Sequence, residues 1–276
     1  MKLSDITFVI VTFNSEGIIE DCLNTLPNES RKIIVDNSGN ENLKINLEKN
    51  YNNLECHLMK ENLGYGRANN FGISLIETDY IFILNPDVKF TDQTMNKLLD
   101  VLKEESFTIA APVDKNEVKN FNFNNKDLRE VNFVRGFAMI LNKNKFSKGF
   151  FDENIFLYLE EIDLCKRVID EKGRIILVNA ELTHEVGFSH GKRDDFEMEK
   201  SRNWHWMWSK FYYNKKHKGY IYGFITTLPN FFTAILKFIF YSLMNKKKKD
   251  IYKMRILGLF NSYLKKSSFY RPYTNN

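Results

Sequence analysis

The stretch from Tyr80 to Val88 constrains most strongly how this chain can fold. Residues 80–84 form an apolar run rich in aromatic and β-branched side chains, which predicts a buried strand. Pro86 has no N–H to give to a sheet, so the strand should end at Asn85. Asp87 then follows the carboxyl end of a buried strand, where open α/β sheets bind their ligands. A carboxylate there can hold a divalent cation, although an Asp in a turn can also bond its own backbone.

Length and composition indicate one large α/β domain, or one domain with an appendage. The chain has 276 residues, of which 43% are hydrophobic and 27% charged, as is typical of globular proteins. Its three scattered cysteines argue against a disulfide framework or a zinc site and favour a reducing compartment. An apolar run begins at Ile6, so we expect no signal peptide and a cytoplasmic location.

Charge is distributed unevenly along the chain. From Ser201 onward there are 15 Lys and Arg against the single acid Asp250, a net charge of +14. The remainder has 25 basic and 34 acidic residues, a net charge of −9. An acidic N-terminal part followed by a basic, aromatic-rich tail suggests that the two parts of the chain have different functions.

The first 40 residues predict a βαβ unit. Residues 6–11 read as a strand, Ser15 could cap the following helix, and residues 32–35 read as a second strand. Asp36 ends this second strand, where a carboxylate can bind a ribose hydroxyl or a base edge. An Asx turn at Asp36 is an equally open interpretation.

Two later stretches also carry chemistry. The loop 62–72 has three glycines that allow a ligand close to the backbone, and a helix should follow to Ile76. Apolar residues at helical spacing after Glu160 and Glu161 place this acidic pair near a helix N-terminus, a common position for acids. His184 follows another strand, and such a histidine is often only a structural hydrogen bonder.

Taken together and in order, these stretches resemble the inverting family 2 glycosyltransferases, with bacterial rhamnosyltransferases of cell-surface polysaccharide synthesis most similar. The resemblance covers roughly residues 6–190 and implies a GT-A (Rossmann-like) α/β fold, with a mixed central sheet flanked by helices. The matching pieces are Val11-Thr12-Phe13-Asn14, Val35-Asp36-Asn37-Ser38, Asn62-Leu63-Gly64-Tyr65-Gly66, Leu84-Asn85-Pro86-Asp87, Gly149-Phe150-Phe151-Asp152 with 158–167, and His184.

The resemblance also implies roles for individual residues. A nucleotide site would be formed by Thr12, Asn14, Asp36, Asn62, Gly64, Arg67 and Asn85. Asp87 would bind Mg²⁺ or Mn²⁺ together with His184, whereas Asn85 stands where many relatives carry a first aspartate. The general base would be Glu161, at a position where the family usually has Asp, with Glu160 as the alternative base and Asp163 as a structural residue. A flanking acid should raise the pKa of the base by like-charge repulsion.

The expected reaction is transfer of rhamnose from dTDP-rhamnose to a lipid-linked saccharide. A UDP-hexose donor is the first alternative, and a catalytically inactive nucleotide-sugar-binding subunit is the second. Nucleic-acid binding is not expected, because no recognised nucleic-acid module is present.

The tail predicts membrane association. Between Tyr220 and Met244 the chain is apolar, but Pro229 should interrupt it and Lys237 would be costly in a bilayer, by about 2.5–3.5 kcal/mol. We therefore expect an amphipathic helix from Phe231 that lies in the membrane plane, with the lysines of 246–249 on an anionic leaflet. The enzyme would be peripheral, on the cytoplasmic face of the membrane. Packing on the enzyme body or on another subunit, in a homo-oligomer, is the alternative.

These patterns predict two domains. Residues 1–200 would be the catalytic domain, and residues 201–276 a basic, aromatic-rich helical extension that associates with the membrane.

Overall fold

The structure, a computed structural model, describes residues 2–124, 126–185 and 195–271. It consists of two compact units, which are treated separately below. The α/β unit comprises residues 1–151 and 161–191, and the helical unit comprises residues 152–160 and 192–276. The predicted division after residue 200 into a catalytic domain and an extension concerns function and stays a prediction.

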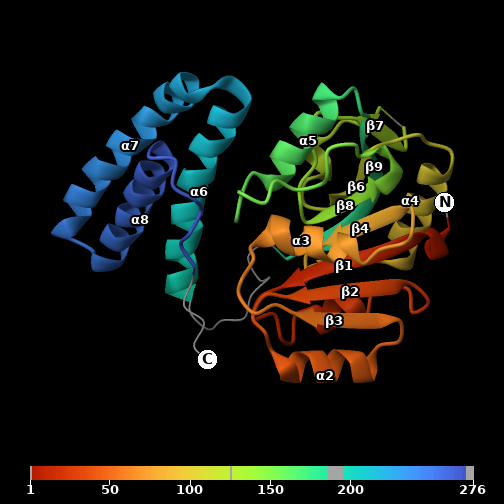
Figure 1. Cartoon of the computed structure of the whole chain (residues 1–276). Helices are drawn as coiled ribbons and strands as arrows, with labels where there is room; N and C mark the ends of the chain where they lie inside the picture. Colours follow the sequence, from red (N-terminus) through yellow and green to blue (C-terminus); the bar gives the residue numbers. More distant parts are fainter. Residues whose placement is uncertain (1, 125, 186–194, 272–276) are drawn as a thin grey trace. The chain divides into compact units, whose positions relative to one another are not determined.

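A mixed sheet with strand order β3-β2-β1-β4-β8-β6-β9-β5 organises the α/β unit, and β7 pairs with β9 (Figure 1). Neighbours among β1 to β4 run parallel, whereas β8 is antiparallel to both β4 and β6. This sheet, with its flanking helices, confirms the predicted α/β class. The strands are β1 (Ile6–Thr12), β2 (Arg31–Asp36), β3 (Leu54–Leu58), β4 (Tyr80–Leu84), β5 (Val88–Lys89), β6 (Ile109–Asp114), β7 (Leu128–Glu130), β8 (Ala138–Asn142) and β9 (Ile175–His184).

The order of the first four strands creates a place for a ligand. The chain proceeds from β1 outward to β2 and β3, and then returns to add β4 on the other side of β1. Ligands of open α/β sheets bind where the strand order reverses in this way, at the carboxyl ends of the strands. The segments that follow β1 and β4 therefore flank the expected binding edge.

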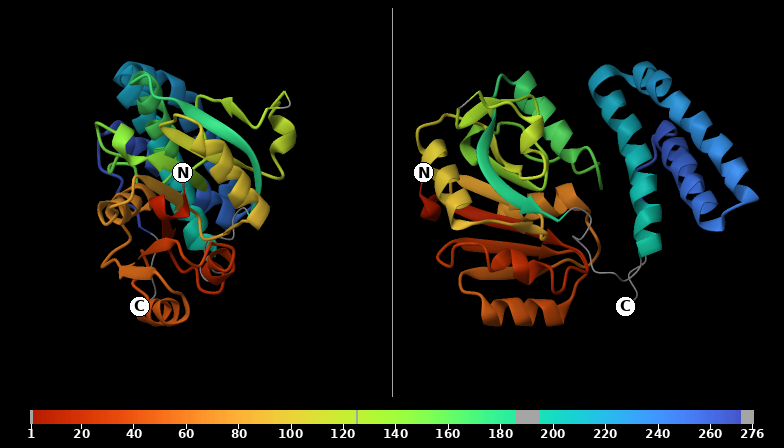
Figure 2. Two further views of the ribbon diagram at one scale, coloured as in Figure 1. Left: turned by 90° about the vertical axis from the view of Figure 1, so that its right-hand side faces the viewer. Right: turned by 180° about the vertical axis from the view of Figure 1, so that it is seen from behind.

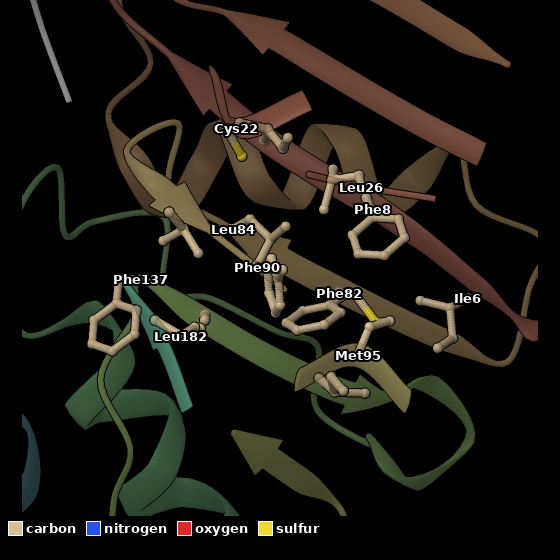
Figure 3. Packing of buried hydrophobic residues seen from close by; sticks show 14 of the residues in the cluster. Ile6, Phe8, Cys22, Leu26, Phe82, Leu84, Phe90, Met95, Phe137 and Leu182 are labelled. Carbon is tan, nitrogen blue, oxygen red and sulfur yellow. The ribbon is translucent and has the colours of Figure 1, made fainter. Parts of the chain in front are cut away.

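Strand β1 is buried on both of its faces. Phe8 and Ile10 belong to one hydrophobic core and Val9 and Val11 to the other, which explains the unbroken apolar run in the sequence. Figure 3 shows the first core, in which Phe8 stacks on Phe82 with ring centroids 5.3 Å apart. The sheet is thereby held rigidly beneath the binding edge.

The helices of this part of the chain are α1 (Ile19–Leu23), α2 (Glu41–Asn50), α3 (Tyr65–Ser74), α4 (Asp92–Lys103) and α5 (Glu160–Asp170). The prediction that Ser15 caps the first helix is wrong. Ile18 precedes α1 without a side-chain cap, and the Ser15 hydroxyl instead accepts a hydrogen bond from the Phe13 N–H at 3.1 Å. Helix α2 and strand β3 had no counterpart in the sequence prediction.

Three helices make up most of the helical unit: α6 (Asp195–Lys218), α7 (Tyr220–Ser242) and α8 (Lys246–Tyr263). They lie side by side in the right-hand view of Figure 2 and pack on a core of Met207, Phe211 and Leu259. At Gly258 a Cβ atom would lie 2.2 Å from the Trp204 carbonyl oxygen, so only glycine allows α8 this close to α6. The predicted C-terminal helical extension is confirmed.

Helix α7 buries small residues and exposes large apolar ones, which is the reverse of an ordinary helix in a soluble protein. Its buried residues are the small Gly223, Thr227 and Ala234. Six large apolar side chains of α7 and its C-cap instead face solvent and fall within roughly 60° of the helix circumference at 3.6 residues per turn. We call them the outer stripe: Ile221, Ile225, Phe232, Leu236, Ile239 and Leu243. Leu236 is 68% exposed and Leu243 93%.

The predicted interruption at Pro229 is wrong. Helix α7 is 23 residues long and contains Pro229 without a break. In the described part of the chain α7 alone has the length and apolar composition to cross a membrane. Only 17% of its most apolar window is buried in the protein, unlike the core helix of a soluble domain.

Candidate active site

Asp87 and His184 meet at the edge of the sheet. Strand β5 starts directly after Asp87 and pairs antiparallel with β9, with Val88 opposite His184. The Glu185 N–H donates to the Asp87 carbonyl at 3.0 Å and closes this corner. His184 Nε2 consequently lies 3.4 Å from Asp87 Oδ1. The two residues predicted to share a metal ion are thus adjacent.

The Asp87 carboxylate suits a cation. It is only 1% exposed, and neither of its oxygens accepts a hydrogen bond from the residues that the structure describes. Burying a carboxylate in this way is costly unless a positive charge compensates it. The described residues include no cluster of three or more His, Cys, Asp or Glu side chains. One carboxylate and one imidazole still fit Mg²⁺ or Mn²⁺, since Mg²⁺ commonly takes one or two protein ligands and completes its shell with phosphate and water.

Phe137 supports both sides of this corner. Its carbonyl accepts the Asn85 N–H at 2.8 Å, which fixes the turn leading to Asp87. Its ring stacks on the His184 imidazole, with centroids 4.4 Å apart. Sequence reasoning missed this residue, which looks like one more apolar position beside a strand. Strand β8 begins only at Ala138, so Phe137 lies in the preceding loop, where it holds the site.

Glu161 lies in the first turn of α5, as predicted. Its side chain is half-buried, and its carboxylate accepts the backbone N–H groups of Glu161 itself and of Ile162. Burial raises the pKa of this carboxyl group above the ordinary 4.5, against the lowering effect of those N–H groups and of Arg135. The predicted direction is correct. The largest cause is burial, whereas the prediction named repulsion from a neighbouring acid.

Gly136 and Tyr65 frame the Glu161 side chain. A Cβ atom at Gly136 would lie 3.4 Å from Glu161 Cβ, an ordinary van der Waals separation, so the Gly136 backbone lies directly beside the Glu161 side chain. The Tyr65 hydroxyl, from α3, donates to the Gly136 carbonyl at 2.6 Å. Since Gly136 precedes Phe137, one short loop contacts Glu161 at its start and His184 at its end.

The other acids of α5 have different surroundings. Glu160 is the first residue of the helix and is buried. Asp163 is fully buried, and its carboxylate accepts Arg167 Nε at 3.0 Å, in line with a structural role. Arg167 also donates to the carbonyls of Gly149 and Phe150 and so fastens α5 to the loop before it.

Asp36 and Thr12 end neighbouring strands, β2 and β1, and form a second polar cluster. Thr12 Oγ1 donates to Asp36 Oδ1 at 2.9 Å. The Ser38 hydroxyl lies 2.8 Å from both carboxylate oxygens, and the Asn40 N–H donates to Oδ2 at 2.8 Å. Asp36 is fully buried, so its carboxylate organises this edge from within.

Asn37 links this cluster to the glycine loop. Its side chain accepts the Leu63 N–H at 3.1 Å and donates to the Gly64 carbonyl at 3.3 Å. Asn62 Oδ1 accepts the Gly64 N–H at 2.9 Å, and Gly64 has φ +80°, a left-handed conformation that favours glycine. The structure thus brings Thr12, Asp36, Asn62 and Gly64 into one hydrogen-bonded edge.

Besides Asn85, whose N–H donates to the Phe137 carbonyl, two further residues of the predicted nucleotide site lie on adjoining segments. Asn14, with φ +51°, follows β1, and Arg67 is exposed in the first turn of α3. A cavity of about 580 Å³ adjoins the loop 135–137, and its lining includes Asp114, Glu117, Phe133, Arg135, Phe137 and Leu177.

Comparisons with known proteins concern the family and the fold. Residues 7–164 match the family Glycosyl transferase family 2. The chain is 22% identical over 193 residues to the low-salt glycan biosynthesis hexosyltransferase Agl10 of Haloferax volcanii. That match covers 60% of this chain and 62% of the relative, so the chain spans less than two thirds of the relative's length.

Two solved structures share the fold at low sequence identity. The mannosyltransferase PcManGT from Pyrobaculum calidifontis, in complex with GDP-Man and Mn²⁺, aligns with a TM-score of 0.59 and 13% identity, over 95% of this chain and 88% of that one. TarS from S. aureus, in complex with UDP, aligns with a TM-score of 0.53 and 15% identity, over 94% and 88% of the two chains. Because the family match includes more than half of its residues, this chain belongs to glycosyl transferase family 2.

Proposed function

We propose that this protein is an inverting glycosyltransferase that moves a hexosyl group from a nucleotide-diphosphate sugar to a saccharide hydroxyl. The observation that carries the proposal is the buried Asp87 carboxylate, 3.4 Å from His184 Nε2 at the carboxyl end of β4. A site for an anionic, cation-bound ligand at this edge agrees with the family to which the chain belongs.

Glu161 is the proposed base. Its raised pKa makes it a better proton acceptor than an ordinary glutamate, and a hydroxyl that loses its proton to it becomes a stronger nucleophile. The acceptor oxygen then bonds to the anomeric carbon while the bond to the diphosphate breaks on the opposite face. The configuration inverts, and the proton remains on Glu161. We propose that the acceptor enters through the cavity beside Arg135 and Phe137.

The donor would be held at the edge formed by the ends of β1, β2 and β4. We assign the nucleotide to Thr12, Asn14, Asp36, Asn62, Gly64, Arg67 and Asn85. Asp87 and His184 would hold Mg²⁺ or Mn²⁺, whose chemistry is to neutralise the charge that develops on the diphosphate leaving group. The polar edge around Asp36 supports this assignment, since it is already ordered by hydrogen bonds.

For the donor we favour dTDP-rhamnose, on the resemblance of Asn85-Pro86-Asp87 to the rhamnosyl branch. A UDP-hexose is the alternative, and two solved structures that share this fold contain UDP and GDP-Man. The proposed acceptor is a lipid-linked saccharide, as suits a chain similar to a glycan-biosynthesis hexosyltransferase.

We further propose that the enzyme is peripheral to the cytoplasmic face of the cell membrane. Burying the outer stripe of α7 in lipid would remove large apolar side chains from water, and Lys246 to Lys249 follow directly at the start of α8. Residues 1–200 would then carry catalysis, and residues 201–276 would carry attachment.

The decisive experiment measures release of nucleoside diphosphate from dTDP-rhamnose, UDP-glucose, UDP-N-acetylglucosamine and GDP-mannose, with and without Mn²⁺. The proposal expects Mn²⁺-dependent turnover of one donor by the parent and none by Asp87→Ala, which controls for contaminating hydrolases. Binding of a donor without turnover, with or without a saccharide acceptor, would instead favour an inactive nucleotide-sugar-binding subunit.

A further inference from the structure

Residues 152–160 precede the proposed base in the chain but belong to the helical unit. Asp152 Oδ2 accepts the Tyr212 hydroxyl at 3.0 Å and Lys216 Nζ at 2.7 Å. The Leu157 carbonyl accepts the buried Ser209 hydroxyl at 2.8 Å. The segment is therefore bonded to side chains of α6 at two points, Asp152 and Leu157.

Aromatic contacts add to these bonds. The Phe156 ring stacks on the His205 imidazole at 4.4 Å between centroids, and the central carbon of the Arg271 guanidinium lies 3.8 Å from the centroid of the same Phe156 ring. Tyr158 meets Trp206 edge-on at 5.5 Å. The segment is thus held along most of its length by α6 and the residues after α8.

His205 fastens the C-terminal segment in the same place. Burial lowers the pKa of its imidazole to about 3, so the ring is neutral at physiological pH. Nε2 can then donate to the Tyr270 carbonyl at 2.6 Å while Nδ1 accepts the Ser268 hydroxyl at 2.9 Å. Because this pKa lies well below physiological pH, the contact does not act as a pH switch in that range.

The backbone between this segment and the base is strained. Tyr158 and Leu159 both have left-handed φ angles, +71° and +70°, which residues with side chains rarely adopt. Such conformations persist only where the surrounding contacts enforce them, and they gather at functional sites. Helix α5 starts at the next residue, Glu160, and its first turn supplies the N–H groups that bond the Glu161 carboxylate.

We infer that the helical unit positions the proposed base: Ser209, Tyr212 and Lys216 hold residues 152–157, and the turn at Tyr158 and Leu159 passes that constraint to Glu161. The inference rests on the proposed function, in which Glu161 removes the acceptor proton. Ser209 and Tyr212 are positioning residues, since they touch the segment and not the reacting atoms.

Two conservative variants test the inference, each with a matched control in the same unit. Ser209→Ala removes the bond to Leu157, and its control Ser242→Ala removes a bond to Phe238 within α7. Tyr212→Phe removes the bond to Asp152, and its control Tyr220→Phe removes a bond to the Tyr263 carbonyl. We expect roughly tenfold lower kcat in the two test variants, because small displacements of a catalytic group lower the rate steeply.

The donor KM should be unchanged, and the midpoint of the acid limb of the kcat–pH profile should shift. Ser209→Cys should restore part of the rate.

A second measurement does not depend on activity. Amide hydrogen exchange at residues 159–163 should become faster in Ser209→Ala and Tyr212→Phe, whereas exchange in α4 should match the parent. A parent that turns over no donor would refute the proposed function but leave this measurement intact. The inference would be overturned if exchange at residues 159–163 in the test variants equalled that in the controls. It would also be overturned if the parent were active and the test variants matched the controls in kcat and in the midpoint of the acid limb.

Discussion

His184 Nε2 is brought to 3.4 Å from Asp87 Oδ1 by the pairing of β5 with β9, which sets Val88 opposite His184. The two residues are distant in the sequence, and β5 is only two residues long. A short strand therefore fixes the distance between Asp87, which follows β4, and His184, the last residue of β9. Much of the chemistry proposed for this protein depends on that one pairing.

Asp87→Ala should abolish transfer and weaken donor binding chiefly when Mg²⁺ or Mn²⁺ is present. The reason is that the variant removes the buried carboxylate that would hold the cation. Isothermal titration with the donor, with and without metal, measures the effect, and Asp100→Ala on the exposed face of α4 is the control. Equal donor affinity of variant and parent in both conditions would contradict this role for Asp87.

Glu161→Gln should remove turnover and leave donor binding nearly intact, because only the transition state requires the proton acceptor. Glu160→Gln should have a milder effect on kcat. Steady-state kinetics of both variants, with donor affinity measured separately, decide between the two acids. The reverse ranking would move the base to Glu160.

The pH dependence follows from the raised pKa of Glu161. Transfer requires the ionised carboxylate, so kcat should fall as the pH falls, with a midpoint above the ordinary 4.5. The same shift affects stability in the opposite sense. A carboxyl group whose pKa is raised by folding destabilises the folded state once the pH exceeds its unfolded value.

Glu161→Gln should therefore raise Tm at neutral pH while abolishing the rate, and this gain should vanish near pH 4. Thermal unfolding followed by circular dichroism at the two pH values tests it. A lower Tm for the variant at neutral pH would mean that the ionised carboxylate stabilises the fold.

Attachment to membranes should depend on both charge and the outer stripe. Replacing Lys246 to Lys249 with Gln would remove four contributions of about 1 kcal/mol each near an anionic leaflet. Leu236→Gln in the stripe should weaken binding at every salt concentration, whereas the lysine contribution should fade with salt, since exposed charges are screened over about 8–10 Å. Transfer to a short soluble acceptor should barely change.

Co-sedimentation with anionic vesicles at low and high salt measures these effects. Binding that resists salt and survives the four substitutions would indicate a spanning or purely hydrophobic anchor. A parent that does not bind vesicles would favour packing of the stripe against another subunit.

The sequence predicted those parts of the fold that depend on local pattern. The buried strands β1, β2 and β4 followed from continuous apolar runs. The positions of Asp87 after a strand and of Glu161 in the first turn of a helix also followed from the pattern, whereas the base role of Glu161 came from the family resemblance. Helix α2 was missed because its mostly polar sequence buries only Leu43 and Leu47, too few to give a clear apolar face.

Residues that act through non-local contacts could not be found in this way. Phe137 looks like one more apolar residue before a strand, and only the folded chain shows that it contacts both Asn85 and His184. Pro229 is a case in which a local signal was misleading. A proline usually ends a helix, but α7, which packs against α6 and α8, continues through it.

The inverted faces of α7 bear on how such a protein can diversify. Its inward row is closely constrained: a Cβ atom at Gly223 would lie 3.0 Å from the backbone nitrogen of Lys215. The outer stripe projects into solvent, so its side chains can be exchanged without disturbing the packing of α6 and α8. Under the proposed membrane attachment, substitutions in the stripe alone could adapt the protein to lipids of different composition while leaving the catalytic residues unchanged.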